Sequence, residues 1–212
     1  MLNVCEIFTS IQGESSFAGR PCTFIRLSGC NLQCVWCDTA YSRLESGNKM
    51  SVEQILREAS KSHVNLIEIT GGEPLLQKDT AALCEELLKS KYTVMIETNG
   101  TLDIGVLSSK VKRIVDIKCP GSGSGGSFLV DNIKRLTKND EVKFVISSVE
   151  DAEWAKKICE EHDLPKKCTV IFSPVMSLVS LDSLAKWLTG SGLDAQLGIQ
   201  LHKIIWGDKR GV

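Results

Sequence analysis

Three cysteines within a short segment are the residues of this chain best suited to chemistry. Cys30, Cys34 and Cys37 form a CxxxCxxC pattern directly after the apolar segment 22–27, and no fourth cysteine lies nearby. Thiolates are the usual ligands of iron–sulfur clusters. Three thiolates on a four-iron cluster leave one iron open to a cofactor or substrate. The spacing therefore predicts a catalytic [4Fe-4S] cluster rather than a purely structural one.

A structural zinc site is the alternative interpretation of the same triplet. Such sites normally use four Cys or His ligands, often as two CxxC pairs. The second pair is missing here, and the 3 histidines of the chain lie far from the triplet in sequence. The spacing favours the cluster over a non-catalytic zinc module.

A second motif, Thr70-Gly71-Gly72-Glu73-Pro74, follows the apolar segment LIEIT. Two adjacent glycines let a ligand approach the backbone closely. The Glu73 carboxylate and the backbone carbonyls are acceptors that suit an ammonium group. A glycine pair is often only a turn, but its place at the end of a predicted strand favours a ligand site.

The elements that must position these motifs alternate between β-rich segments and helical patterns. Ser51 and Gln54 form a capping box at the start of one predicted helix. We expect strands over 22–27, 66–70, 93–98, 113–118, 141–146, 169–172 and 195–200, and helices over 51–62, 80–89, 127–136, 150–162 and 181–188.

This alternation predicts an α/β fold built from right-handed βαβ units with a mostly parallel sheet. A complete eightfold barrel typically needs about 250 residues, more than the 212 of this chain. We therefore expect an incomplete, open (β/α) TIM-like barrel that forms a single domain over residues 1–212. Functional residues are expected at the carboxyl ends of its strands.

Composition limits the partners and the compartment. The chain is 42% hydrophobic and 24% charged with a net charge of -1, so neither a nucleic-acid surface nor a membrane surface is expected. No apolar segment approaches the roughly 20 residues that span a bilayer. The N-terminus does not resemble a secretory signal, and the odd count of 9 cysteines argues against a disulfide framework. A cytoplasmic location is expected.

Taken together, the cysteine triplet and Thr70–Pro74 resemble the motifs of the radical S-adenosylmethionine superfamily. The resemblance implies that Cys30, Cys34 and Cys37 hold a [4Fe-4S] cluster. It also implies that Gly72 and Glu73 contribute to binding S-adenosyl-L-methionine. In that superfamily the open iron chelates the cofactor, and reductive cleavage yields a 5′-deoxyadenosyl radical that abstracts hydrogen from a substrate.

The N-terminal segment EIFTSIQGES, with GRP, FIRL, CDT and the QLHK tail, is similar to the 7-carboxy-7-deazaguanine synthase family. The similarity spans nearly the whole chain, and IQGE is more specific than the cluster motif. Members convert 6-carboxy-5,6,7,8-tetrahydropterin to 7-carboxy-7-deazaguanine with loss of ammonia, in queuosine and deazapurine biosynthesis. The similarity implies that the pterin is bound by Ile11, Gln12, Gly13, Arg26 and Thr70.

Several further roles follow from this similarity. The planar guanidinium of Arg26 suits the substrate carboxylate, although an arginine in a half-buried strand can also be a surface residue. Glu14, Glu97 and His202 are possible substrate contacts; their alternatives are a loop glutamate, an ion-pair partner and a packed histidine. Thr39 is implied as a Mg²⁺ ligand, whereas chemistry alone would first suggest Asp38.

The similarity also implies cofactor contacts at Phe172, Ser173 and Pro174 and in the loop after Ile117. Some members carry Ser-Pro-Lys in that loop, and this chain has Cys119-Pro120-Gly121 instead. We expect Cys119 to take the serine position, beside Pro120. A role of Cys119 as fourth cluster ligand is not expected, because it would close the open iron.

The implied partners are a small-molecule pterin, an electron donor such as flavodoxin, and a second copy of the chain in a homodimer. The nearest alternative function is a glycyl-radical-enzyme activase. Such an activase shares the CxxxCxxC and GGEP motifs but acts on a protein backbone. It provides no reason for the IQGE segment.

Overall fold

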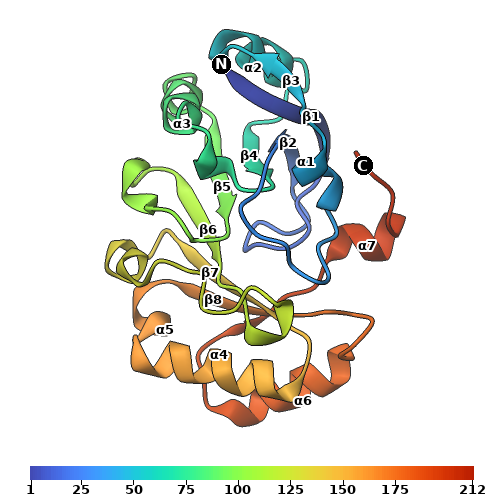
Figure 1. Ribbon diagram of the computed structural model, residues 1–212, viewed down its shortest axis with the longest axis vertical. Coiled ribbons are helices and arrows are strands. Elements are labelled where there is room, and N and C mark those ends of the chain that lie inside the picture. Colours follow the sequence, from blue (N-terminus) through green and yellow to red (C-terminus); the bar gives the residue numbers. More distant parts are fainter.

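The computed structural model describes residues 1–212, which form one nine-stranded sheet with helices along its outer side (Figure 1). The strand order is β3-β1-β2-β4-β5-β6-β7-β8-β9. Every neighbouring pair from β2 to β9 is parallel, and only β1 runs antiparallel to its neighbours. Because β3 and β9 remain separate edges, the predicted open barrel with a mostly parallel sheet is confirmed.

The strands are β1 Leu2–Ile11, β2 Pro21–Leu27, β3 Asn48–Met50, β4 Leu66–Gly71, β5 Thr93–Thr98, β6 Lys112–Asp116, β7 Glu141–Ile146, β8 Thr169–Pro174 and β9 Gln196–Leu197. The α-helices are α1 Ala40–Leu44, α2 Val52–Ser60, α3 Thr80–Lys89, α4 Val149–Glu161, α5 Leu164–Lys167, α6 Leu181–Ser191 and α7 Leu201–Trp206. Four 3-10 helices complete the chain: η1 Pro74–Leu76, η2 Ile104–Val106, η3 Pro120–Ser122 and η4 Val130–Arg135. None of the helices is both long and apolar enough to cross a membrane.

Most predicted elements form where their patterns place them. Helix α3 and strands β5 and β7 have the predicted bounds. The capping box of α2 is present, since the Ser51 hydroxyl accepts from the Gln54 backbone N–H at 3.2 Å. The Gln54 side chain accepts in turn from the Ser51 backbone N–H at 2.7 Å.

Two predictions about elements were wrong. The helix expected over 127–136 is the shorter 3-10 helix η4. Asn132 explains this, because its buried amide donates to the carbonyls of Gly100 and Leu102 and accepts from the Ile104 N–H. These tertiary hydrogen bonds tie the segment to η2. The last strand, expected over 195–200, contains only the two residues of β9.

The outer face of the sheet is apolar and carries the main cores. Helices α2 and α3 pack with β1, β2, β4 and β5 around one cluster of 15 buried residues. Strands β6 to β8 pack with α4 and α6 around another of 17, which includes Phe144 and Phe172. Alternate residues of the same strands face the other way, and there the buried side chains include Glu68 and Lys143. The inner face of the barrel therefore carries buried polar side chains, next to a small apolar cluster of Cys22, Leu66, Met95 and Ile114.

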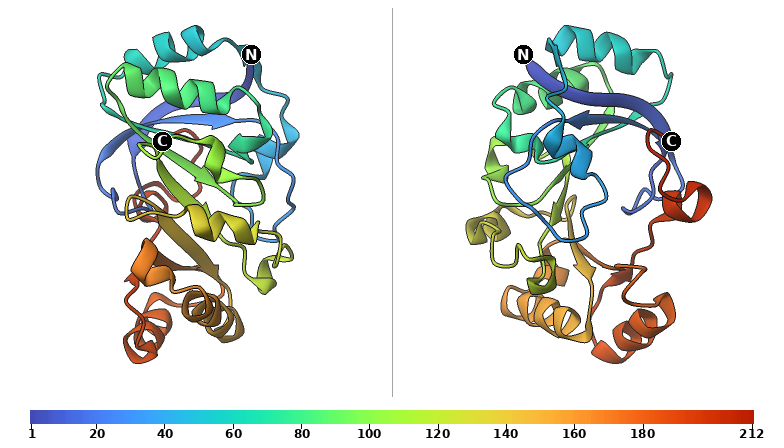
Figure 2. Two further views of the ribbon diagram at one scale, coloured as in Figure 1. Left: turned by 90° about the vertical axis from the view of Figure 1, so that its left-hand side faces the viewer. Right: turned by 45° about the vertical axis from the view of Figure 1, so that its right-hand side comes forward.

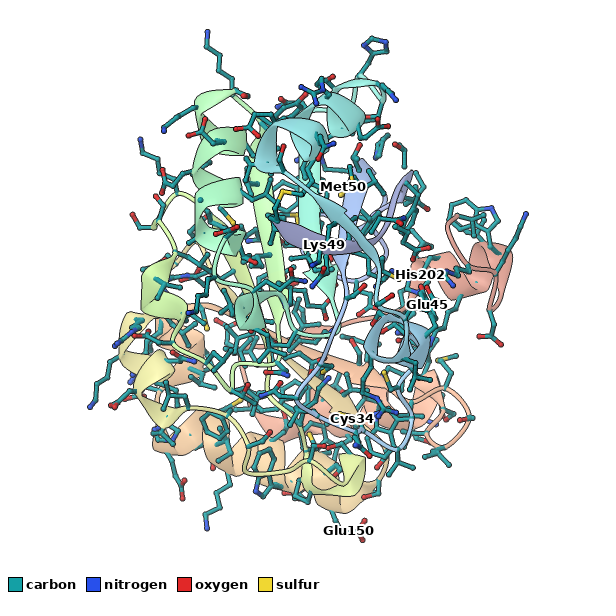
Figure 3. All side chains as sticks on the ribbon, turned by 45° about the horizontal axis from the view of Figure 1, so that its top comes forward. Cys34, Glu45, Lys49, Met50, Glu150 and His202 are labelled. Carbon is teal, nitrogen blue, oxygen red and sulfur yellow. The ribbon has the colours of Figure 1, made fainter.

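The segment after β9 returns across the molecule, so that α7 and the C-terminus lie beside β1 (Figure 2). The Leu201 N–H donates to the Gly13 carbonyl at 3.0 Å and joins α7 to the end of β1. A Cβ at Gly13 would lie 2.3 Å from Nδ1 of His202, so only glycine allows this approach. Figure 3 labels His202 on α7 and Glu45, which follows α1.

Candidate active site

The cluster loop, residues 28–39, connects β2 to α1 and carries the three cysteines. It packs directly on the glycine pair that ends β4. The Glu73 N–H donates to the Gly29 carbonyl at 2.8 Å, and the Gly72 N–H donates to the Leu27 carbonyl at 3.2 Å. A Cβ at Gly72 would lie 2.1 Å from the Gly29 oxygen and 2.7 Å from Cβ of Cys30. Glycine is thus required there to bring the two motifs together.

All three thiols of the cluster loop are free. Cys30 Sγ accepts from the Leu32 N–H at 3.5 Å, and Cys34 Sγ donates to the Ser124 hydroxyl at 3.6 Å. Burial raises the pKa of the Cys30 thiol, and the hydrogen bond from the Leu32 N–H offsets this rise only in part. No group of three Cys, His, Asp or Glu side chains lies close enough to hold one metal ion.

This donor set fits a multi-iron cluster better than a mononuclear site. Each sulfur of a cuboidal cluster site binds a different iron, so the three thiols need not converge on one atom. A structural zinc site would need four ligands around a single ion. The three free thiols of Cys30, Cys34 and Cys37 on one loop are the donors that a [4Fe-4S] cluster would need.

Glu73 lies fully buried between the glycine pair and the end of β5. Its carboxylate accepts from the Leu75 N–H, the Thr98 hydroxyl and the Asn99 N–H at 2.7 to 2.9 Å. Burial raises its pKa, and these three donors oppose that rise. The carboxylate expected to accept an ammonium group thus already fastens β4 to β5.

Gln12 and Glu68 form a buried pair at the centre of the barrel. The Gln12 amide donates to Glu68 at 2.8 Å, and its oxygen accepts from the N–H groups of Glu14 and Ser15. Burial, with the nearby charge of Glu97, raises the pKa of Glu68 to about 8 despite the Gln12 hydrogen bond. Glu68 therefore keeps its proton to a higher pH than an ordinary glutamate.

Lys143 is a central residue that the sequence motifs did not reveal. Its ammonium donates to Glu14 at 2.7 Å and to Glu97, and it lies 3.5 Å from Asp116. Its side chain is only 5% exposed. Burial would lower its pKa, but the three carboxylates hold it well above the usual range. The strand sequence EVKFVI could have indicated this position, because Lys143 alternates with the core residues Val142 and Phe144 and so lies on the opposite face of the strand.

The pKa values of the carboxylates around Lys143 are shifted in different directions. Burial would raise the pKa of Glu14, but the charge of Lys143 brings it below its ordinary value. Burial also raises the pKa of Glu97, and there Lys143 only partly offsets the rise. Glu14 further accepts from the Gln200 amide at 2.8 Å, and His202 Nε2 lies 4.0 Å away. Residues from both ends of the chain thus meet at Glu14.

Arg26 lies on β2 beside Thr70 of β4, to which it is paired in register. Its side chain is 13% exposed. Its Nε donates to Glu6 at 2.8 Å, and its terminal nitrogens make no hydrogen bond within the chain. The guanidinium thus offers a free, charged edge to an anion close to where the cluster loop begins.

Comparison with known proteins shows the family of the chain. The model of the radical SAM superfamily matches residues 24–176. A 7-carboxy-7-deazaguanine synthase of Koribacter versatilis is 44% identical over 97% of both chains. The chain belongs to the 7-carboxy-7-deazaguanine synthase family. The synthase of Chlorobaculum tepidum is 41% identical over all of this chain and 97% of its own length.

Solved structures agree with the fold of this family. The crystal structure of QueE from Escherichia coli superposes with a TM-score of 0.77 at 23% identity, covering 95% of this chain and 94% of that protein. Streptococcus suis SuiB with its precursor peptide SuiA gives a TM-score of 0.57 at 19% identity, over 84% of this chain and 48% of that protein. The predicted family is confirmed, and the activase and zinc-module alternatives receive no support from these relatives.

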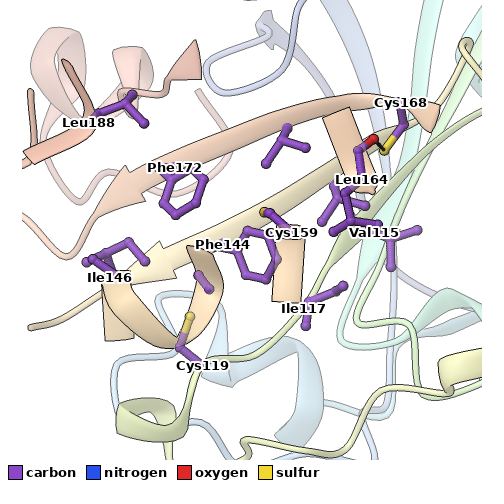
Figure 4. Packing of buried hydrophobic residues seen from close by; sticks show 14 of the residues in the cluster. Val115, Ile117, Cys119, Phe144, Ile146, Cys159, Leu164, Cys168, Phe172 and Leu188 are labelled. Carbon is purple, nitrogen blue, oxygen red and sulfur yellow. Dashed lines mark hydrogen bonds between the residues drawn. The ribbon is translucent and has the colours of Figure 1, made fainter. Parts of the chain in front are cut away.

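Some residues that the family pattern assigned to the cofactor have side chains in the core. Figure 4 shows Cys119 and Phe172 inside the apolar cluster, where both are almost fully buried. Only their backbone atoms remain for a ligand. Pro120 begins η3 at the surface, and Pro174 ends β8 in a buried position. The Ser122 carbonyl of this loop accepts from the Val35 N–H at 3.0 Å and ties it to the cluster loop.

Two orphaned polar atoms lie near these strand ends. The hydroxyl of Ser173 and Oδ1 of Asp116 are buried and have no hydrogen-bond partner. Buried polar atoms normally have partners, so both are suited to bind a polar ligand. Together with the glycine backbone at Gly72, they fit a polar cofactor such as S-adenosyl-L-methionine.

Thr39 is the last residue of the cluster loop and the N-cap of α1. Its hydroxyl has only a long contact of 3.9 Å, to Cys37 Sγ. Asp38, in contrast, is paired with Lys203 at 2.9 Å. Burial would raise the pKa of Asp38, but Lys203 lowers it. Thr39 is therefore the neighbour with an available oxygen, which fits a Mg²⁺ ion that takes its other ligands from substrate and water.

Proposed function

We propose that this protein is a radical S-adenosylmethionine enzyme that converts 6-carboxy-5,6,7,8-tetrahydropterin to 7-carboxy-7-deazaguanine with loss of ammonia, in queuosine and deazapurine biosynthesis. The observation that carries the substrate assignment is Arg26. It presents a free guanidinium edge on the strand that leads into the cluster loop. Family membership supports the reaction.

The cofactor side of the site consists of the two motifs that Gly72 brings together. Cys30, Cys34 and Cys37 would hold the [4Fe-4S] cluster, and Gly72 and Ser173 would contact S-adenosyl-L-methionine. Cys119, Pro120, Phe172 and Pro174 would contribute backbone or packing contacts there. When bound, the cluster and cofactor supply the 5′-deoxyadenosyl radical that abstracts hydrogen from the substrate.

The substrate side is the polar inner face of the barrel. Arg26 would pair with the substrate carboxylate. Glu14 and Glu97 can accept hydrogen bonds from the N–H groups on the aminopyrimidine edge of the pterin, while Lys143 keeps these two carboxylates in place. The remaining contacts would come from Ile11, Gln12, Gly13, Thr70 and His202.

Thr39 is proposed as the protein ligand of Mg²⁺. Its hydroxyl is available, and a hard cation there could orient the substrate carboxylate during the rearrangement. Thr39→Ala should weaken the Mg²⁺ dependence of turnover. An unchanged response to Mg²⁺ titration would remove Thr39 from the metal site.

The proposed macromolecular partners are an electron donor such as flavodoxin and a second copy of the chain. An electron donor needs access to the cluster, and Val35 in the cluster loop is 77% exposed. The exposed Ile204 and Ile205 on α7 support a homodimer. Residues 1–212 would act as one domain, because one continuous sheet connects every strand.

The decisive test is anaerobic incubation of cluster-loaded protein with S-adenosyl-L-methionine, a reductant and carboxytetrahydropterin. We expect 7-carboxy-7-deazaguanine in the wild type and neither cluster nor product in Cys34→Ala. Cys84→Ala is the matched control, because Cys84 is a core residue on α3. This variant should keep both the cluster and the formation of product. Cofactor cleavage without deazaguanine would reject the substrate assignment, and turnover in Cys34→Ala would reject the cluster site.

A further inference from the structure

The C-terminal tail fastens onto the N-terminal half through one arginine, in what we call the Arg210 clasp. The clasp consists of Glu6, Tyr41, Glu45 and Arg210. Arg210 donates through Nε to Glu6 at 2.9 Å and through its two terminal nitrogens to both oxygens of Glu45 at 2.8 Å. Its guanidinium carbon lies 3.9 Å from the centroid of the Tyr41 ring. Every polar edge of Arg210 is thus engaged.

Glu6 connects this clasp to Arg26. One oxygen of Glu6 accepts from Arg26 Nε and from the Tyr41 hydroxyl, each at 2.8 Å. The other oxygen accepts from Arg210. The Glu6 side chain is 16% exposed, so water competes little for these positions. Three donors on one carboxylate fix its orientation.

The orientation of Glu6 determines which part of Arg26 stays available. A carboxylate beside an arginine tends to form two parallel hydrogen bonds with it, and so occupies Nε and one terminal nitrogen. Here Arg210 holds the second oxygen of Glu6. Arg26 therefore bonds Glu6 through Nε alone and keeps both terminal nitrogens free.

We propose that Arg210 is a positioning residue that keeps the Arg26 guanidinium open to the substrate carboxylate. This inference rests on the proposed function, because it assumes that Arg26 binds that carboxylate. Without Arg210, Glu6 would rotate onto Arg26 and compete with the substrate for the same nitrogens. The C-terminal tail thereby acts on carboxylate recognition, although Arg210 itself stays outside the reaction.

Binding of two stable, fluorescent probes tests this without any turnover. The probes are oxidised 6-carboxypterin, which carries the carboxylate, and pterin, which lacks it. Each is titrated into wild type, Arg210→Gln, Arg210→Lys and the control Lys209→Gln. Lys209 is an exposed neighbour in the same tail that forms no ion pair or side-chain hydrogen bond. Its replacement by Gln therefore removes one positive charge, as Arg210→Gln does, but breaks no contact. Thermal unfolding of each variant verifies the fold.

We expect wild type and Lys209→Gln to bind 6-carboxypterin more tightly than pterin. In Arg210→Gln, affinity for 6-carboxypterin should fall about tenfold, the size of one charged hydrogen bond, while affinity for pterin stays the same. Arg210→Lys should recover part of the loss, since an ammonium can still hold Glu6.

The possible failures are distinguishable. Equal wild-type affinities for the two probes would reject the assignment of Arg26 to the carboxylate, and with it this inference. A wild-type preference for 6-carboxypterin that persists undiminished in Arg210→Gln would reject the positioning role alone. Equal losses for both probes would also reject it, because they would indicate a general disturbance of the site.

Discussion

Glu68 is a buried carboxyl group whose side chain forms no ion pair. Its only side-chain partner is the Gln12 amide, and its pKa is raised by burial and by Glu97 to about 8. The folded protein keeps a proton on Glu68 that the unfolded chain releases near the ordinary pKa of 4.5. This group therefore stabilises the fold fully below pH 4.5, and its contribution declines as the pH rises toward 8.

Glu68→Gln should remove that pH dependence. A glutamine is neutral at every pH and can still accept from Gln12. Relative to wild type, we expect the variant to gain free energy of unfolding between pH 5 and pH 8, by up to a few kcal/mol, since each pKa unit corresponds to about 1.4 kcal/mol. Urea denaturation at several pH values measures this. Parallel pH profiles of variant and wild type would show that Glu68 ionises normally.

Lys143 balances the charge of three carboxylates inside the barrel. In Lys143→Met, Glu14 and Glu97 would lose their buried ammonium partner. Removing one partner of a buried ion pair typically costs about 3–5 kcal/mol of unfolding free energy. Chemical denaturation at pH 7 should show a loss of that size, and the added Glu97→Gln change should restore part of it. Strict additivity of the two changes would contradict the coupling.

An exposed lysine provides the control for this experiment. Lys134 pairs with Asp131 at 2.8 Å on η4, and both side chains are largely exposed. Surface ion pairs contribute about 0–1 kcal/mol. Lys134→Met should therefore have little effect on stability.

At the scale of elements, the glycine pair sets how closely β4 approaches the cluster loop. Ala at position 72 would place its Cβ 2.1 Å from the Gly29 oxygen, so the loop would have to move. We expect Gly72→Ala to lower both iron content after cluster reconstitution and the free energy of unfolding, the latter by about 1–3 kcal/mol. Iron and sulfide analysis, with denaturation, measures these effects.

Gly190 on α6 is the matched control for the glycine experiment. Nothing lies within 4 Å of a Cβ built there. Because alanine favours helices, Gly190→Ala should stabilise the protein by up to about 1 kcal/mol and leave iron content unchanged. Equal iron content in the two variants would mean that the close approach of Gly72 does not matter for the cluster.

The predictable elements are those with local signals. Short β-rich segments located most strands of the parallel sheet, and the capping box of Ser51 located α2. Strand β1 and helix α7 escaped prediction because their polar residues are satisfied by partners distant in sequence. Glu6 bonds Arg26 and Arg210, and Lys203 bonds Asp38. In the candidate site, the sequence motifs predict roles for the cysteines and Gln12. The position of Lys143 depends instead on which face of β7 turns inward, and no motif indicated this.

At the scale of the whole molecule, the stability of the fold and the completeness of the site depend on different segments. Both large apolar cores are built from residues 2–188, and neither contains a residue of the C-terminal segment. Instead, that segment contributes polar contacts. Gln200 bonds Glu14, and Lys203 bonds Asp38. The C-terminal segment thus completes a polar site around Glu14 and Asp38 without contributing to either apolar core.

This separation predicts the effect of removing residues 201–212, which deletes α7 and the tail. Because the cores and all nine strands remain, we expect cooperative thermal unfolding and normal iron incorporation. Because His202, Lys203 and Arg210 are lost, we expect binding of 6-carboxypterin to disappear in fluorescence titrations. The Lys209→Gln full-length chain serves as the control. A truncated chain that binds 6-carboxypterin normally would place the complete pterin site within residues 1–200, and one that fails to unfold cooperatively would give α7 a structural role.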